Sequence, residues 1–318
     1  MKGSRILFVT LVLFLGLTLG AYAKGSSQQL RMATGGNTGT YYAFGSAVGQ
    51  ILTEKTKVPI TIQSTGASKA NIQLIAEGEV EIAIVQNDVM DYAYRGVDLF
   101  TGEQTLDFAA MAALYAEVCQ VVVNPATGIQ TIADLKGKNV SVGDAGSGVE
   151  FNAKQILAAY GISFNDINKQ NLSFGASADA LRDNKIDAFF CVAGAPTTAI
   201  VDLAIGKEIA ILEIDDEHAQ LLMRDYPFYT QFPVPANSYK GVTAPVNTLA
   251  VKATFIVSKK VSADTVYNLT KALLESKAEI QTAHAKGAEL SVEYAVSGIS
   301  VPFHPGAEKY FREIGAIK

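Results

Sequence analysis

The chain has 318 residues, of which 26 are Lys or Arg and 31 are Asp or Glu, so its formal charge at pH 7 is −5. Hydrophobic residues make up 49% of the chain and charged residues 18%. This composition excludes an intrinsically disordered chain, which would be poor in apolar residues and rich in net charge. The acidic balance also argues against a nucleic-acid binder, because phosphate attracts basic surfaces.

The first 23 residues have the pattern of a secretory signal peptide. Lys2 and Arg5 precede an apolar stretch at residues 6–20, and Ala21 and Ala23 are the small residues that precede a cleavage site. The stretch is shorter than the roughly 20 residues that a transmembrane helix needs. Cleavage after Ala23 is therefore favoured over the alternative, an uncleaved N-terminal anchor, and we predict an exported, periplasmic protein.

A strand, a glycine-rich loop and a helix follow one another twice along the chain. These two sets are predicted at residues 30–34, 35–39 and 40–54, and at 139–142, 143–148 and 149–160. A helix followed by a buried strand also occurs twice, at 68–77 and 81–85, and at 177–183 and 187–192. Alternating strands and helices at this rhythm predict parallel sheets covered by helices. We therefore expect two similar α/β lobes.

Two long apolar runs, residues 117–123 and 249–257, bracket the second set and resemble the two crossing segments of a hinge. The predicted organisation is a signal peptide (1–23), a first lobe (24–116 plus 251–318) and a second lobe (117–250). Helical spacing of apolar residues predicts a helix over 263–284 and a last short helix around 307–314. Residues 226–245 are rich in Pro and aromatic residues without a clear period, and we expect a structured loop at the edge of a cleft.

A glycine loop that leads into a helix exposes unpaired backbone N–H groups at the positive end of the helix dipole, which suits a carboxylate or a phosphate. Two such loops, one in each lobe, would face each other at the carboxyl ends of the strands. The alternative is that each is an ordinary tight turn. Neither loop has the glycine spacing or the Lys of the nucleotide-binding motifs, so a nucleotide is disfavoured.

Neutral polar side chains gather near the same predicted strand ends, and no Arg lies in a glycine loop. A bound carboxylate is therefore expected to be held by backbone N–H groups and hydroxyls. Glu117, in an apolar run at the predicted hinge, has two open interpretations: it pairs with a ligand ammonium, or it accepts a hydrogen bond within the hinge. Cys119 and Cys191 lie in apolar runs, where two buried thiols are favoured over a disulfide.

No motif of an enzyme is present. The chain has no H-E-x-x-H, no G-x-S-x-G and no S-x-x-K, and its three histidines (His218, His284 and His304) are isolated. We therefore expect a protein without catalysis, metal or cofactor. Two other classes stay open, namely an exported α/β enzyme with an unrecognised site and a cell-surface interaction protein without a small ligand.

Several motifs taken together resemble the TAXI-type solute receptors, which are the extracytoplasmic subunits of TRAP transporters. The matching segments are ATGGNTGTYY (33–42), STGAS (64–68), IVQND (84–88), VGDAGSG (142–148), GAP (194–196) and HPGA (304–307). LYAE (114–117) is similar to the L-Y-P-E segment of the family, with Ala in place of Pro. These matches span nearly the whole mature chain in the right order.

The resemblance implies a two-lobed type II periplasmic binding protein fold, in which each lobe is a mixed, mostly parallel sheet flanked by helices and a two-segment hinge joins the lobes. It also implies capture of a small carboxylate such as glutamate or glutamine, delivery to an ion-gradient-driven membrane permease and, by analogy, a monomer. A binding protein for an ABC importer or a sensor is the alternative within this class. The residues that the resemblance assigns to the ligand site are Thr38, Gly39, Tyr41, Ser64, Ser68, Gln86, Glu117, Ser147 and Gly148.

Overall fold

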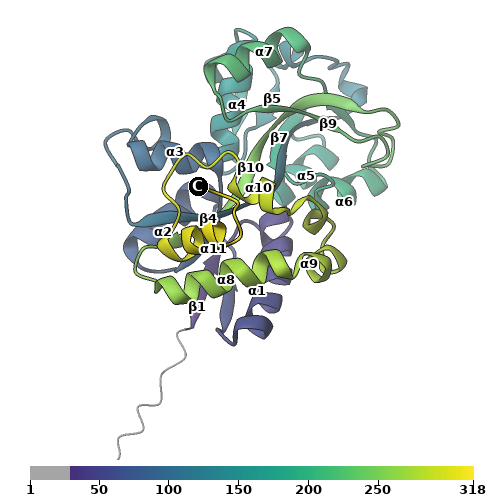
Figure 1. Ribbon diagram of the computed structural model, residues 1–318. Coiled ribbons are helices and arrows are strands. Elements are labelled where there is room, and N and C mark those ends of the chain that lie inside the picture. The colour runs from purple at the N-terminus through teal and green to yellow at the C-terminus, as the bar shows by residue number, and fades with distance from the viewer. Residues whose placement is uncertain (1–28) are drawn as a thin grey trace, which may run out of the picture.

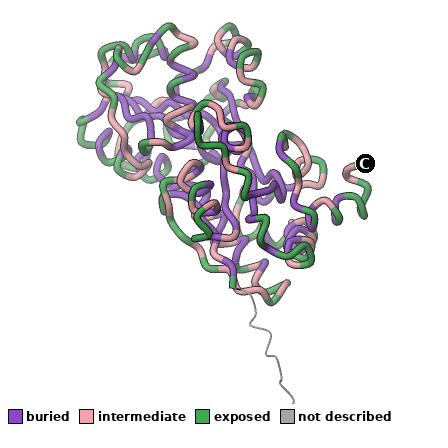
Figure 2. The backbone as a smooth tube through the Cα atoms, turned by 90° about the vertical axis from the view of Figure 1, so that its left-hand side faces the viewer, coloured by how far each residue is buried: buried purple, intermediate pink, exposed green. Residues whose placement is uncertain are grey.

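The computed structural model describes residues 29–318, so the predicted signal peptide lies outside the described residues. Within these residues, ten strands form one continuous sheet flanked by helices, and Figure 1 shows these elements gathered into two lobes. The strand order is β2-β1-β3-β10-β4-β7-β5-β6, with β8 beside β4 and β9 beside β10. Figure 2 shows that the strands at the centre are mostly buried while exposed residues gather on the outer loops and helices.

Two long strands, β4 (Phe108–Val123) and β10 (Val246–Ser258), run through both lobes. They pair in antiparallel fashion, and the register of the pair shifts between Ala253 and Thr254 and between Phe255 and Ile256. Every residue of β4 is buried, which accounts for its unbroken apolar sequence. In the first lobe β10 also pairs with β3, and in the second lobe β4 pairs with β7 and β8. These strands are the two crossing segments, while the lobe boundaries at 116/117 and 250/251 stay a prediction.

The first lobe is built on three parallel strands. They are β1 (Leu30–Ala33), β2 (Ile60–Gln63) and β3 (Ile82–Gln86). Three helices are interleaved with them: α1 (Thr40–Thr56), α2 (Ser68–Glu77) and α3 (Asn87–Arg95). After β10 the chain returns to this lobe with α8 (Ala263–Glu275), α9 (Lys277–Ala283), α10 (Val292–Val296) and α11 (Pro305–Glu313). The second lobe is therefore inserted within the first.

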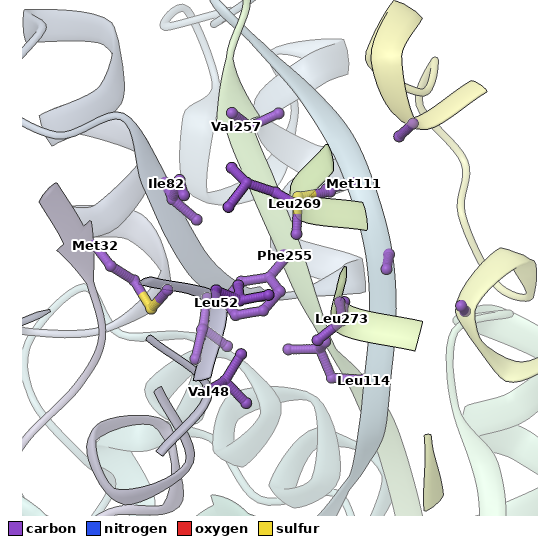
Figure 3. Packing of buried hydrophobic residues seen from close by; sticks show 14 of the residues in the cluster. Met32, Val48, Leu52, Ile82, Met111, Leu114, Phe255, Val257, Leu269 and Leu273 are labelled. Atoms are coloured by element: carbon purple, nitrogen blue, oxygen red, sulfur yellow. The ribbon is translucent and has the colours of Figure 1, made fainter. Parts of the chain in front are cut away.

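The core of the first lobe joins elements from both ends of the chain. Figure 3 shows Met32, Leu52, Phe255 and Leu273 converging from β1, α1, β10 and α8. All four side chains are fully buried. Burying a side chain of this size stabilises the folded state by about 1.5–3 kcal/mol. The C-terminal helices thus hold α1, and the glycine loop before it, against the hinge strands.

The second lobe repeats the parallel arrangement. Its strands are β5 (Asn139–Ser141), β6 (Asn168–Gln170), β7 (Ala188–Ala193), β8 (Ala210–Leu212) and β9 (Thr230–Val234). β5 pairs in parallel with both β6 and β7. Its helices are α4 (Gly148–Ala159), α5 (Phe174–Arg182), α6 (Thr198–Gly206) and α7 (Asp216–Asp225). Short 3-10 helices lie at Asp98–Phe100, Pro125–Thr127, Ile132–Leu135, Phe164–Asp166 and Ala285–Glu289.

The two cysteines are both buried and free, as the sequence favoured. Cys119 on β4 lies opposite Val192, and Cys191 on β7 lies opposite Gln120. Cys119 packs in one core cluster of the second lobe and Cys191 in the other. Because neighbouring residues of a strand point to opposite faces of the sheet, the two thiols lie on opposite faces and cannot pair without rearrangement.

Three sequence predictions of local structure need correction. The helix expected over 263–284 consists of α8 and α9, which are separated at Ser276. The segment expected to be a loop, 226–245, contains β9, an edge strand that pairs only with β10 and tolerates Pro233 for that reason. The helix expected at 177–183 begins three residues earlier, at Phe174, where the side chain of Ser173 caps it.

Candidate functional site

A cavity lies at the junction of the two lobes, beside the carboxyl ends of the parallel strands. The cavity has a volume of about 40 Å³, which is room for a few water molecules, because the lobes lie close together around it. The first lobe contributes Gly35, Gly36, Thr38, Gly39, Thr40, Tyr41, Ala67, Ser68 and Gln86 to its lining, and the crossing strand β4 contributes Glu117. The second lobe contributes Asp144, Ser147, Val149, Ser173, Phe174, Val192 and Ala193.

Five helices begin at residues that line this cavity. The residues that precede their first turns are Gly39 for α1, Ala67 for α2, Gln86 for α3, Ser147 for α4 and Ser173 for α5. Each helix begins with backbone N–H groups that have no partner within the helix, and its dipole adds partial positive charge at the same end. No residue of the described lining is a Lys or an Arg. Among the lining residues, positive charge therefore comes only from the partial charges of backbone N–H groups.

The loop before α1 contacts the second lobe directly. The Thr40 hydroxyl donates to the carbonyl oxygen of Gly194 at 3.0 Å, and the Ala199 N–H donates to the carbonyl oxygen of Thr38 at 3.2 Å. A Cβ atom at Gly39 would lie 3.4 Å from the Phe174 ring, so this glycine allows the two lobes to meet closely. The lobes are therefore in contact around the cavity.

Glu117 on β4 forms part of the cavity wall near the hinge. It is 1% exposed, and its Oε2 accepts a hydrogen bond from the Tyr41 hydroxyl at 2.6 Å. Burial raises the pKa of Glu117 well above its ordinary value, the Tyr41 hydrogen bond opposes that shift, Asp88 adds to it and Lys286 opposes it. Both interpretations from the sequence thus remain physically open, because Glu117 accepts an internal hydrogen bond and also faces the cavity.

In the second lobe, Ser147 has a local structural role as well as a place in the cavity wall. Its Oγ accepts a hydrogen bond from the Glu150 N–H at 3.1 Å and so caps the N-terminus of α4. Asp144, in the same loop, also lines the cavity, and burial raises its pKa. The second glycine loop therefore brings a cap and a carboxyl group to the site.

The junction is closely packed between Gln86 of the first lobe and α4 of the second. A Cβ atom at Gly148 would lie 1.6 Å from Gln86 Oε1, far inside any contact distance. Gln86 Nε2 donates to Asn152 Oδ1 at 2.5 Å, and Gln86 is 3% exposed. Gly148 itself stands beside Gln86, outside the cavity lining.

Seven of the nine residues assigned from the sequence lie in the lining, and Gly148 packs behind one of them. Ser64 is placed elsewhere: it is exposed, and its hydroxyl donates to the carbonyl oxygen of Gly35 at 2.9 Å. Its contact with a ligand stays a prediction. Ser68 is buried and its Oγ accepts from the Gln86 N–H at 3.1 Å.

The sequence did not single out Phe174, Ser173 or Asn152 for the site. Ser173 and Phe174 were missed because the start of α5 was expected at residue 177, although a Ser before an apolar run is a recognisable helix-cap signal. Asn152 lies inside a helix and carries no local signal of its contact with the other lobe.

Among residues 29–318, no helix combines the length and apolar character needed to cross a membrane. Over the same residues, no group of three or more His, Cys, Asp or Glu side chains is arranged to hold a metal ion.

Solved structures with the same architecture define the class of fold. The structure of PhnD1 from Prochlorococcus marinus (MIT 9301) in complex with methylphosphonate has a TM-score of 0.56 at 9% identity, covering 92% of this chain and 100% of that one. A protein from Bordetella bronchiseptica RB50 has a TM-score of 0.56 at 15% identity, with 91% and 89% covered. The binding protein component of an ABC phosphonate transporter from Pseudomonas aeruginosa has a TM-score of 0.51 at 12% identity, with 82% and 79% covered.

The predicted fold class is therefore confirmed: the chain has the two-lobed α/β fold of type II periplasmic binding proteins. The model of the NMT1-like family matches residues 32–315, and the chain belongs to the NMT1-like family.

Proposed function

We propose that this protein is the periplasmic solute-binding subunit of a TAXI-type TRAP transporter. It captures a small amino acid or carboxylate, such as glutamate or glutamine, between its lobes and delivers it unchanged to a membrane permease driven by an ion gradient. The fold, the interlobe cavity and the predicted signal peptide at residues 1–23 support export and capture. The motif resemblance to TAXI receptors supports the transporter type.

The observation that carries this proposal is the convergence of five helix N-termini on one cavity at the lobe junction. Unpaired N–H groups at helix N-termini bind carboxylates without the help of a basic side chain. Thr38, Tyr41 and Ser68 add hydroxyl groups to the same wall. A small carboxylate would gain hydrogen bonds from both lobes, so it would bind the closed form better than the open form and shift the equilibrium between them.

Two carboxyl groups distinguish an amino acid from a simple dianion. Glu117 on the crossing strand β4 and Asp144 in the second lobe both line the cavity. An ammonium group beside them would favour their ionised forms and offset the rise that burial causes in their pKa values, whereas a second negative charge would raise those pKa values further. A zwitterionic ligand therefore uses both parts of the wall, with its carboxylate at the helix N-termini and its ammonium near Glu117.

A second candidate is a binding protein for an ABC importer of a phosphonate. It is favoured by the likeness to PhnD1 and to the Pseudomonas aeruginosa protein, which are similar to this chain in fold. Helix N-termini suit a phosphonate as well as a carboxylate. The two acidic groups in the lining count against a dianion.

The test is a thermal-unfolding panel on the chain from residue 24, freed of bound solute by unfolding and refolding. The panel contains glutamate, glutamine, 2-oxoglutarate, C4 dicarboxylates, branched-chain amino acids, methylphosphonate and sugars. A ligand at 100 times its Kd stabilises the folded state by about 2.7 kcal/mol, which raises the Tm by several degrees. A rise with an amino acid supports the proposal, and a rise with methylphosphonate alone replaces it with the second candidate. No response to any compound counts against small-solute capture.

The transporter type needs a separate measurement. Uptake of the identified solute into vesicles that contain the permease should stop when the ion gradient is collapsed and continue without ATP. Dependence on ATP would assign the protein to an ABC importer. Chemical recovery of the bound solute unchanged would separate capture from catalysis.

A further inference from the structure

A buried polar network crosses the lobe junction beside the cavity. Its centre is Asn152 on α4, which is completely buried. The Asn152 Nδ2 group donates to Asp88 Oδ2 at 2.9 Å and to the Tyr229 hydroxyl oxygen at 2.8 Å. Its Oδ1 accepts from Gln86 Nε2 at 2.5 Å. One amide of the second lobe therefore joins two side chains of the first.

The network extends to a second crossing point. The Tyr229 hydroxyl donates to Gln155 Oε1 at 2.7 Å, and Gln155 Nε2 donates to the Tyr92 hydroxyl oxygen at 3.2 Å. The Tyr92 ring also packs against Phe151, with ring centroids 5.4 Å apart. Tyr92 belongs to α3 of the first lobe, while Tyr229, Gln155 and Phe151 belong to the second. Polar and apolar contacts thus meet at the same side of the junction.

Of the polar members of this network, only Gln86 lines the cavity. The contacts of Asp88 and Tyr92 with the second lobe therefore depend on how the lobes meet, and not on which solute lies between them. Moving the lobes apart would break each of these contacts together. Buried hydrogen bonds that form and break as a set favour a discrete arrangement over a range of intermediate ones.

We propose that Asp88 and Asn152 form a latch between the lobes, in which Asn152 holds the closed arrangement and positions the Gln86 side chain in the cavity wall. The proposal rests on the proposed function, because closing around a solute is what gives a latch its purpose. Asn152 acts through Gln86 and the lobe junction, so it is a positioning residue.

The chemistry of the latch requires an amide at residue 152. The Asn152 side chain donates to the Asp88 carboxylate and to the Tyr229 hydroxyl oxygen while it accepts from the Gln86 amide, and a carboxamide supplies these two donors and one acceptor in a single neutral group. Asp88 receives its other hydrogen bond from the Val89 N–H, at 2.8 Å from Oδ1. A carboxylate at residue 152 would lose the donor and place two negative charges together.

The charged and titratable groups around Asp88 come from α3, from β4 and from the residue that precedes β9. Asp91 and Tyr92 lie on its own helix, Glu117 and Cys119 lie on β4, and Tyr229 lies just before β9. None of these groups supplies a positive charge. A second carboxylate beside Asp88 would therefore be tolerated only if the pair shared a proton.

The closed arrangement is measured with a cysteine pair across the junction, T38C/G175C. A Cβ atom at Gly175 would lie 3.9 Å from Thr38 Cβ, which fits the usual spacing of about 3.8 Å in a disulfide. The native Cys119 and Cys191 are buried and do not compete for an added disulfide reagent. No solute is added, so the rate of cross-linking reports closure whatever the ligand is. Rates of all variants are compared with the parent pair at the same pH, so that thiol ionisation cancels.

The test variant is Asn152→Asp, and the matched control is Asn168→Asp, which makes the same change at an exposed residue within the second lobe. At about pH 8, Asn152→Asp should slow cross-linking about tenfold or more, because like charges at a buried contact cost several kcal/mol. At about pH 5.5 the deficit should shrink, because the pair of carboxyl groups can hold a proton. Asn168→Asp should cross-link at the parent rate.

The double variant Asp88→Asn with Asn152→Asp exchanges the two groups and restores a donor facing a carboxylate. It should return cross-linking to within about threefold of the parent, the signature of a direct pair in a double-mutant cycle. A parent rate in Asn152→Asp would overturn the latch, and so would a double variant as slow as the single one. Should Asn152→Asp fail to fold, recovery of folding and of cross-linking in the double variant decides the same question. The solute panel tests capture separately, so the two proposals fail in different ways.

Discussion

A methyl group at Gly148 is the smallest change that should keep the lobes apart. The Cβ of Gly148→Ala would lie 1.6 Å from Gln86 Oε1, 2.6 Å from its Cδ and 3.0 Å from Val89 Cγ2. Gln86 and Val89 belong to the first lobe, whereas Gly148 begins α4 in the second. The clash therefore arises only when the lobes meet. Within its own lobe, Ala at the start of a helix is at least as favourable as Gly.

The size of the effect on lobe closure follows from the hydrogen bond that the Gln86 side chain loses. To admit the methyl group it has to leave Asn152, which breaks a 2.5 Å hydrogen bond and leaves the buried Asn152 Oδ1 without its donor. Stranding a buried polar group costs about 1–3 kcal/mol. That free energy corresponds to a closed form about 5- to 150-fold less populated. The short approach to Val89 adds to the cost.

The assay is the cross-linking rate of the T38C/G175C pair, together with the affinity for whichever solute the panel identifies. The control is Gly36→Ala, in a cavity-lining loop, where an added Cβ would meet no atom within 4 Å. We expect Gly148→Ala to reduce both quantities and Gly36→Ala to change the cross-linking rate little. Urea unfolding should show no loss of stability within the second lobe. Equal cross-linking in the two alanine variants would refute the packing argument.

Three further changes test the charges and caps of the site. Burial raises the pKa of Asp88 from 3.8 to about 6, so the folded protein binds more protons than the unfolded chain between these pH values. The free energy of unfolding should therefore fall by about 3 kcal/mol as pH rises through that window. Asp88→Asn should remove this part of the pH dependence of urea unfolding, and an unchanged profile would contradict the assignment. Tyr41→Phe removes the hydroxyl that donates to buried Glu117 and should lower the free energy of unfolding by about 1–3 kcal/mol. It should also raise the pKa of Glu117 further. Equal stability of the variant and the parent protein in urea would contradict this role of the Tyr41 hydroxyl. Ser147→Ala removes the cap of α4 and should lower the free energy of unfolding by about 1 kcal/mol, whereas Ser147→Asn keeps a capping side chain and should keep the stability. Loss of solute affinity in both variants would show that Ser147 contacts the ligand as well as capping the helix.

The parts of the fold that the sequence predicted well are governed by local signals. The strand–loop–helix units around Gly35 and Gly143 combine an apolar strand, glycines and helical periodicity within a few residues of each other. The helix at Ser68–Glu77 has the bounds expected for it, because Gly78 in the left-handed region ends it. Such units depend little on the rest of the chain.

The parts that the sequence did not predict depend on contacts between distant segments. Gln86 ends β3 and directly precedes α3 with no intervening loop, so no turn residues mark the start of that helix in the sequence. Asn152 and Asp88 are 64 residues apart, and neither a buried Asn in a helix nor an Asp in a first helical turn indicates a partner. β9 was not predicted because it contains Pro233, and a proline in a strand pattern is usually evidence against a strand. A single sequence carries no signal that indicates which of its distant residues will pair.

Closure and recognition share Gln86 but otherwise involve different residues of the same junction. The cavity wall combines helix N-termini, which favour a carboxylate, with Glu117 and Asp144, which favour an ammonium. The Asp88–Asn152 contact lies outside that wall and gains nothing from the chemistry of the solute. Burying the Asp88 carboxylate costs free energy at neutral pH, since burial is the dominant cause of its raised pKa. Closure that buries Asp88 is therefore less favourable above about pH 6 than below it. On the proposed function, the solute's contacts with both lobes add to the latch, so that closure would be most complete when a solute is bound.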